Sequence, residues 1–110
     1  MPHAELKYSA DLNIDAVKVM HVIEDRINAH DPGAGACKGR AYPADVFHHT
    51  HLLVEISMLT KPHRDAAFTL KLRDDLEQAI KACLSQSCAF SMALSYSDAI
   101  YITNKFEPAS

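Results

Sequence analysis

The chain has 110 residues, of which 48% are hydrophobic and 23% are charged, with three glycines and five prolines. This balance is typical of one globular domain, and it excludes disordered, collagen-like and low-complexity chains. Eleven Lys and Arg residues against fourteen Asp and Glu residues give a formal net charge of −3. A nucleic-acid partner is therefore not expected, because phosphate binding needs a basic face.

The three cysteines, Cys37, Cys83 and Cys88, show no metal-ligand or redox spacing, and disulfides cannot use all three. We interpret them as reduced thiols. Cys37 lies in a predicted loop near Lys38 and Arg40, a setting that can lower the pKa of a thiol.

The segment at the start of the chain is not a basic stretch followed by an apolar run, so no signal peptide is expected. Apolar runs are also far shorter than the roughly 20 residues of a membrane span. The sequence therefore predicts a soluble cytoplasmic protein with no membrane partner.

A strand and a helix are predicted first. Residues 2–8 alternate between apolar and polar side chains, which is typical of a half-exposed strand. Residues 14–29 predict a helix, with Asn13 as its N-cap and Asp15 in its first turn. Its apolar stripe consists of Ala16, Val19, Met20, Ile23 and Ile27. The Pro- and Gly-rich residues 30–35 end it.

Two strands are predicted next, over residues 39–47 and 50–58, joined tightly at His48-His49. Pro43 cannot donate a ladder hydrogen bond, so the first of them is an edge strand or carries a bulge. Alternate residues of the second strand share one apolar face: Thr50, Leu52, Val54, Ile56 and Met58.

Residues 61–85 predict the longest helix, with Thr60 as its cap and Pro62 in its first turn. Its apolar stripe consists of Phe68, Leu72, Leu76, Ala79, Ile80, Cys83 and Leu84.

A strand over residues 88–96 follows, with large apolar side chains on one face and only Ala and Ser on the other. The small face suits close approach by another layer, such as a second subunit. A last extended segment is expected over Ile100–Lys105, after a turn at Ser97-Asp98.

This element order predicts an α/β (α+β) domain over residues 1–110. Two βαβ units side by side make a four-stranded sheet with both helices on one face. No remaining element can cover the other face, where Tyr42, Leu53 and the small residues lie. That face is too apolar for solvent, so we expect an oligomer.

Pro2 is the first candidate for chemistry. Removal of Met1 would leave a prolyl secondary amine, and an α-amino group has a pKa of about 7.7. An apolar pocket and a nearby cation would favour its neutral form, which could move a proton at neutral pH. The alternative is that Pro2 has no chemical role, as in the many proteins where Pro follows Met.

Cationic residues supply the next candidates. Arg40 could bind a carboxylate through its planar fork, although a surface ion pair is the commoner use of such a residue. Lys61, His63 and Arg64 surround the start of the predicted second helix and could form an anion-binding corner. The alternative is a solvated loop.

The histidines at positions 48, 49 and 51 suggest a metal site. Two histidines one residue apart on a strand point the same way, but a third ligand is needed. Glu55 lies too far along the strand, so packing or hydrogen bonding in an oligomer is the favoured interpretation.

The residues together resemble a known family. Segment 1–3 opens a strand, Gly39-Arg40 follows the first helix, and residues 51–56 form a strand before the long second helix. In these motifs and in element order, the chain resembles the 5-carboxymethyl-2-hydroxymuconate isomerase family of the tautomerase superfamily.

The resemblance implies a βαββαβ subunit that assembles as a homotrimer, with the sheets lining its centre and no cofactor or metal. It assigns acid/base catalysis to Pro2 and binding of a substrate carboxylate or 2-oxygen to Arg40. Where the family has a second Arg, this sequence has Lys61 as the nearest equivalent, or Arg64 from the helix.

The activity implied by the resemblance is a 1,3-allylic proton shift. It ketonises a 2-hydroxymuconate-type unsaturated carboxylic acid, as in the catabolism of aromatic compounds. The segment Lys61–Arg64 departs from the family pattern, which favours an alternative: a non-catalytic oligomeric binding protein on the same scaffold. A ferredoxin-like dimer with a similar element order is a third interpretation.

Overall fold

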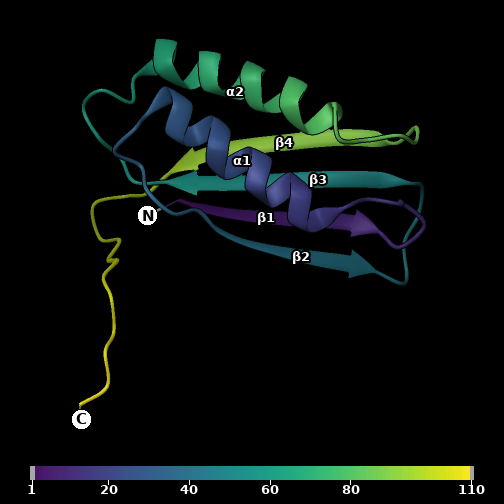
Figure 1. The fold of residues 1–110 in the computed structure, drawn as a ribbon, viewed down its shortest axis with the longest axis horizontal. Helices are drawn as coiled ribbons and strands as arrows, with labels where there is room; N and C mark the ends of the chain where they lie inside the picture. Colours follow the sequence, from purple (N-terminus) through teal and green to yellow (C-terminus); the bar gives the residue numbers. More distant parts are fainter. Residues whose placement is uncertain (1, 110) are drawn as a thin grey trace.

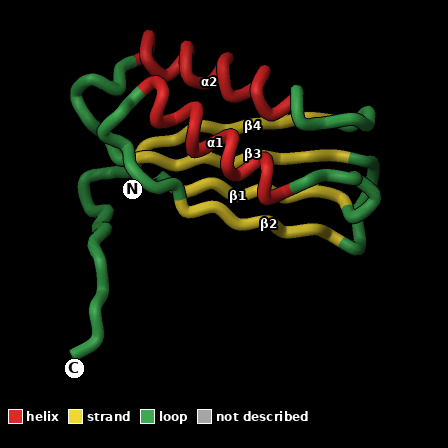
Figure 2. Tube along the Cα trace, in the orientation of Figure 1, coloured by secondary structure: helices red, strands yellow, loops and turns green. Residues whose placement is uncertain are grey.

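A computed structural model describes residues 2–109, and Figures 1 and 2 show how their helices and strands are arranged. The elements are β1 (His3–Ser9), α1 (Ala16–His30), β2 (Lys38–Ala44), β3 (His51–Met58), α2 (Ala66–Lys81) and β4 (Ala89–Tyr96). The predicted order of strands and helices up to β4 is confirmed. Neither helix has the length and apolar content needed to cross a membrane.

The sheet has the strand order β2-β1-β3-β4. The central pair, β1 and β3, is antiparallel, while the outer pairs are parallel. Both helices cover one face, and no described element covers the other (Figure 1). Pro43 lies in an edge strand, as predicted. Because β1 separates β2 from β3, residues 45–50 form a longer connection, and the predicted tight joint at His48-His49 is wrong.

The core lies between the helices and the covered face of the sheet. The predicted alternation of β3 is confirmed, because its even-numbered residues from 52 to 58 are at most 2% exposed. The helices contribute Val19, Ile23, Ile27, Leu72, Leu76 and Ile80, all fully buried. Burial of each such side chain is worth roughly 1.5–3 kcal/mol, so this layer holds the helices on the sheet.

Both helices begin later than predicted. Asp15, rather than Asn13, caps α1, because its carboxylate accepts the N–H of Lys18 at 3.1 Å. Asp65 caps α2 and accepts the N–H of Phe68 at 2.9 Å. Each carboxylate satisfies an N–H group that has no partner within its helix.

Thr60 is predicted to cap the second helix, but in the structure it binds Ser97 instead. Its hydroxyl donates to the carbonyl of Ser97 at 2.6 Å, and its N–H donates to the Ser97 hydroxyl at 3.2 Å. Thr60 therefore ties the β3–α2 loop to the end of β4. Pro62 lies in this loop rather than in the helix, and α2 ends at Lys81 rather than at residue 85.

The predicted terminal strand over Ile100–Lys105 is absent from the sheet. Residues 99–100 form a turn, and residues 101–109 have no regular secondary structure. The segment runs away from the subunit in both views (Figures 1 and 2), so its backbone has no neighbouring strand to pair with.

A buried ion pair joins the loop after α1 to the loop before α2. Asp31 Oδ2 accepts hydrogen bonds from Nε (2.9 Å) and Nη2 (2.7 Å) of Arg64, whose Nη1 donates to the Leu59 carbonyl (2.7 Å). The His63 ring nitrogen Nε2 lies 2.9 Å from the same oxygen. Burial raises the pKa of Asp31, but the hydrogen bonds of His63 and Arg64 outweigh it and lower the pKa to about 2.

We expect Asp31→Asn to lower the free energy of unfolding at pH 7 by about 3–5 kcal/mol, because Arg64 is left as an uncompensated buried charge. The folded-state pKa of Asp31 is depressed, so its contribution is present above pH 4 and is lost as the pH falls toward 2. The difference between wild type and variant should therefore shrink by about 1 kcal/mol from pH 5 to pH 3. Urea unfolding at each pH measures it.

The matched control is Asp25→Asn, which removes the charge of an exposed aspartate on α1. It should change the free energy of unfolding by less than about 0.5 kcal/mol. Equal losses in the two variants would contradict the role of the buried pair.

Gly39 marks the closest approach of α1 to β2. A Cβ at this position would lie 2.6 Å from Sδ and 2.9 Å from Cγ of Met20. Such distances are shorter than van der Waals contact, so a side chain at this position would force the Met20 side chain to move.

Gly39→Ala should therefore destabilise the protein by about 1–3 kcal/mol, the usual range for overpacking. The clash with Met20 predicts that Met20→Ala and Gly39→Ala together cost less than the sum of the two single changes. Thermal or urea unfolding of all three variants tests this. Gly33→Ala is the control, because its Cβ would meet only an Asp31 oxygen at 3.7 Å.

Candidate functional site

Pro2 lies where the ends of four strands meet. The register pairs His3 with Ser57, which brings Pro2 next to Met58, and it pairs Met58 with Tyr96. The side chain of Pro2 is less than 2% exposed. The start of β2 lies on the other side of β1. We call this edge of the sheet the proline end, defined by Pro2, Lys38, Met58 and Tyr96.

Two lysines and a helix terminus bring positive charge to the proline end. The backbone N–H of Lys38 donates to the Pro2 carbonyl at 2.9 Å. Lys61 is half-buried in the loop that leads from β3 to α2. The N-terminus of α2 lies at the same end of the molecule (Figure 1), and helix N-termini carry partial positive charge.

Lys38 is a candidate that sequence reasoning missed as a site residue. It is far from Pro2 in the sequence, and only the parallel pairing of His3 with Lys38 brings the two together. Burial, and then the positive charges of Arg40 and Lys38, lower the pKa of His3. The positive charges of Arg40 and Lys38 are therefore close enough to affect the pKa of His3, the residue that follows Pro2.

Arg40 lies on the open face of the sheet. Its Nη2 binds Glu5 at 2.5 Å, its Nε donates to the Tyr42 hydroxyl at 2.8 Å, and its Nη1 lies 3.3 Å from Nδ1 of His3. By the alternation of β1, the ring of Pro2 lies on the helix-covered face. Within one subunit, the structure does not bring the Arg40 guanidinium and the Pro2 ring to the same side of the sheet.

Arg64 points inward rather than toward a ligand. Its side chain is 2% exposed, and the bonds to Asp31 and Leu59 use all three of its nitrogens. The three residues of the predicted anion-binding site, Lys61, His63 and Arg64, therefore do not act together on an anion. Arg64 joins two loops, His63 binds the same aspartate, and Lys61 is left as the lysine of this loop at the proline end.

A small hollow opens at the proline end. Its volume is about 130 Å³, and it is lined by Ser57, Met58, Tyr96, Ser97 and Tyr101. The Tyr96 hydroxyl lies 2.6 Å from Oγ1 of Thr69, which fixes the ring against α2. A space of this size suits a small molecule with few polar groups.

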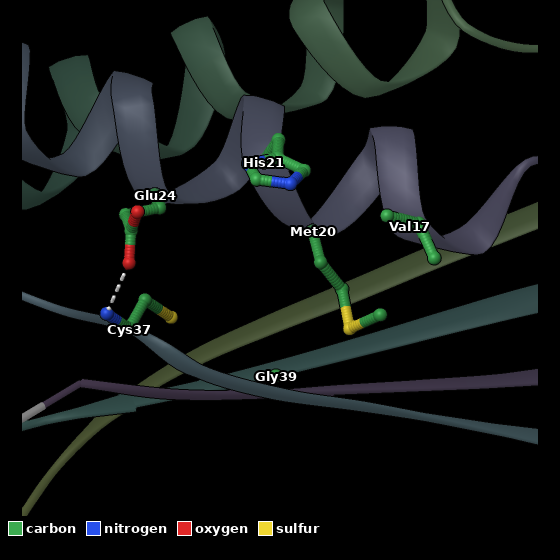
Figure 3. A pocket seen from close by; sticks show the side chains of 6 residues that line it. All are labelled: Val17, Met20, His21, Glu24, Cys37 and Gly39. Carbon is green, nitrogen blue, oxygen red and sulfur yellow. Dashed lines mark hydrogen bonds between the residues drawn. The ribbon is translucent and has the colours of Figure 1, made fainter.

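A second cavity, of about 210 Å³, lies between α1 and β2 (Figure 3). Its lining includes Met20, His21 and Glu24 of α1 and Cys37 and Gly39 beside them; Glu24 Oε2 accepts the N–H of Cys37 at 2.8 Å. Burial, and then the charge of Glu24, raise the pKa of Cys37 to about 11. The predicted lowering by nearby cations is therefore wrong, and the thiol is protonated at neutral pH.

The histidines considered as metal ligands lie in or beside the connection before β3. The rings of His48 and His49 lie close together but tilted by 48°, with centroids 3.9 Å apart, and His51 Nδ1 donates to the His49 carbonyl at 2.9 Å. Across residues 2–109, no group of three His, Cys, Asp or Glu side chains could hold a metal ion. All three cysteines are free thiols.

Comparison with known proteins rests on structure. No protein-family model and no curated protein matches the sequence. A solved 5-carboxymethyl-2-hydroxymuconate delta-isomerase is 17% identical over 96% of this chain and 89% of its own, with a TM-score of 0.74. A 5-carboxymethyl-2-hydroxymuconate isomerase from Deinococcus radiodurans is 15% identical over 94% and 90%, with a TM-score of 0.75.

A fused 4-OT, described as a symmetric trimer, is 17% identical over 86% of this chain and 85% of its own, with a TM-score of 0.61. Each of these similarities covers most of both chains. They confirm the predicted architecture: the chain has the fold of the tautomerase superfamily, the superfamily that its sequence resembles.

Proposed function

We propose that the protein is an isomerase of the tautomerase type, which moves a proton within a small unsaturated carboxylic acid. The burial of Pro2 at the proline end, next to Lys38 and to Met58, which lines a small hollow, carries this proposal. The likeness of the fold to solved 5-carboxymethyl-2-hydroxymuconate isomerases supports it. The substrate class is a 2-hydroxymuconate-type dienoic acid.

Pro2 is the acid/base of the proposed reaction, once Met1 has been removed. An apolar surrounding and a nearby cation both disfavour the protonated amine, so the nitrogen is available as a base near neutral pH. It takes the proton of the 2-hydroxyl group, and the electron pair moves through the conjugated system. The protonated amine then returns a proton to carbon, which yields the unsaturated 2-oxo acid.

Lys61 and Lys38 are the proposed partners of the substrate carboxylates. Both lie at the proline end, and the N-terminus of α2 adds favourable potential for an anion there. Arg40 and Arg64, the arginines suggested by the resemblance, are bound to Glu5 and Asp31 in this subunit. The lysines belong to the proline end itself, and we assign the contact with the substrate to them.

A second candidate function is a binding protein for the same class of acid, without turnover. The inward position of Arg64 favours it, because a lysine is a less specific partner for a carboxylate than the fork of an arginine. The two functions differ in whether Pro2 matters.

Replacement of Pro2 separates the two functions. We expect Pro2→Ala to lower kcat/KM for ketonisation of 2-hydroxymuconate by about 10²–10⁴-fold, the usual contribution of a positioned acid/base. Ultraviolet absorbance of the dienol measures the rate, and intact mass establishes that Met1 is absent. An additional residue before Pro2 should have the same effect, because it converts the amine to an amide.

The control for this change is Pro32→Ala, which removes a proline from an exposed loop. Its activity should equal that of the wild type. Undiminished ketonisation by Pro2→Ala would exclude the catalytic role and leave the binding function.

Lys61→Ala should raise KM by about tenfold with little change in kcat, because about 1.4 kcal/mol of binding to the carboxylate is lost in ground and transition state alike. Lys71→Ala, on the exposed surface of α2, is the control and should have wild-type KM. Arg40→Ala should affect KM less than Lys61→Ala does. The opposite ranking would return the carboxylate contact to Arg40.

A further inference from the structure

The loop that carries Lys61 is short, and it is tied to the proline end on the side before Lys61. It covers residues 59–65, between the end of β3 and the start of α2 (Figure 1). The Thr60 hydroxyl donates to the Ser97 carbonyl at 2.6 Å, and the Thr60 N–H donates to the Ser97 hydroxyl at 3.2 Å. Ser97 lines the hollow at the proline end. Thr60 therefore holds the residue before Lys61 against the wall of that hollow.

Arg64 fixes the same loop from the other side of Lys61. Its Nη1 donates to the Leu59 carbonyl at 2.7 Å. Its backbone N–H donates to the Lys61 carbonyl at 3.0 Å, which closes a turn through residues 62–63. One residue therefore binds the loop both at its start and at Lys61 itself.

The Arg64 guanidinium is in turn held from outside the loop. Its Nε and Nη2 donate to Asp31 Oδ2 at 2.9 and 2.7 Å, and its side chain is 2% exposed. Asp31 follows the last residue of α1, and its N–H donates to the Ile27 carbonyl at 2.8 Å. A buried guanidinium with all three nitrogens bonded has little freedom to rotate. The loop of Lys61 is therefore anchored to the end of α1.

Lys61 differs from the cations beside it. His63 and Arg64 both bind Asp31, whereas among the described residues the Lys61 ammonium forms no ion pair. A flexible lysine loses rotamer freedom when it binds, and a mobile loop would add the cost of ordering its backbone. Because the backbone around Lys61 is already fixed, only its side chain has to be ordered when a carboxylate arrives.

We propose that Arg64 is a positioning residue of the substrate site, which holds the loop so that Lys61 can bind a substrate carboxylate at the proline end. Arg64 does not touch the substrate and acts through Lys61, while Thr60 has the same effect from the other side. The inference rests on the carboxylate contact proposed for Lys61. It gives the buried pair of Asp31 and Arg64 a role in ligand binding besides its role in stability.

The first test measures binding of adipate by isothermal titration calorimetry. Adipate is a six-carbon dicarboxylate without double bonds, so its binding does not require Pro2 to move a proton. Arg64→Lys keeps a cation beside Asp31 but lacks the planar fork that reaches Leu59 as well. It should raise the Kd for adipate by about fivefold. In the Lys61→Ala background the same change should alter the Kd by less than about 1.5-fold, because no ammonium is left to position.

A control and a second variant accompany this measurement. Arg73→Lys makes the same change in an exposed arginine of α2 that pairs with Asp74, and it should keep the wild-type Kd. Thr60→Val leaves the buried pair intact and removes one of the two bonds to Ser97. It should raise the Kd by about twofold, again only while Lys61 is present, and it supplies the same test should Arg64→Lys fail to fold.

Three results would overturn the inference. The first is an unchanged Kd in both Arg64→Lys and Thr60→Val. The second is a rise of the same size with and without Lys61, which would mean that the two residues only support the fold. The third is a wild type that does not bind adipate. Failure of the isomerase function is a separate result, in which ketonisation is absent while adipate binding and its dependence on Arg64 remain.

Discussion

The antiparallel pairing of β1 with β3 is the constraint on which the rest of the structure depends. Each half of the chain is a strand, a helix and a parallel strand, and this pairing is what joins the two halves into one sheet. Because the direction reverses at the join, the start of β1 meets the end of β3. The same register that buries Leu6 and Val54 in one core therefore also places Pro2 beside Met58.

Ion pairs hold both arginines near this junction within the subunit. Arg64 and Arg40 have the fork that suits a carboxylate, but Asp31 and Glu5 already occupy them within the subunit. Removing Arg64 from its site would leave Asp31 as a buried charge, which is far more costly than moving a surface lysine. The chemistry proposed for the proline end is accordingly built on lysines and a helix N-terminus, because Arg64 is buried with Asp31 and Arg40 lies on the opposite face of the sheet from the Pro2 ring.

Periodicity predicted the elements well where a buried face imposed it, and less well at their ends. The stripe of α1 and the alternation of β3 correspond to residues that are fully buried. The sequence predicts the wrong N-cap for both helices, because several polar residues near each helix start could cap it. Asp15 and Asp65 are the N-caps in the structure, while Thr60 binds Ser97, a residue distant in the sequence. The terminal strand failed for a related reason: a strand needs an edge to pair with, and composition does not say where that edge lies.

The sequence by itself determined the order of the elements, the sheet with both helices on one side, and the importance of Pro2 as a candidate. These depend on local patterns, because hydrophobic spacing is enough to select a helix or strand and the face that it buries. Only the tertiary structure decided that Lys38 lies next to Pro2, that Arg64 is buried, and that Arg40 faces away from the Pro2 ring. Each of these depends on strand register or on an ion pair between distant loops, and such contacts leave no periodic signal in the chain.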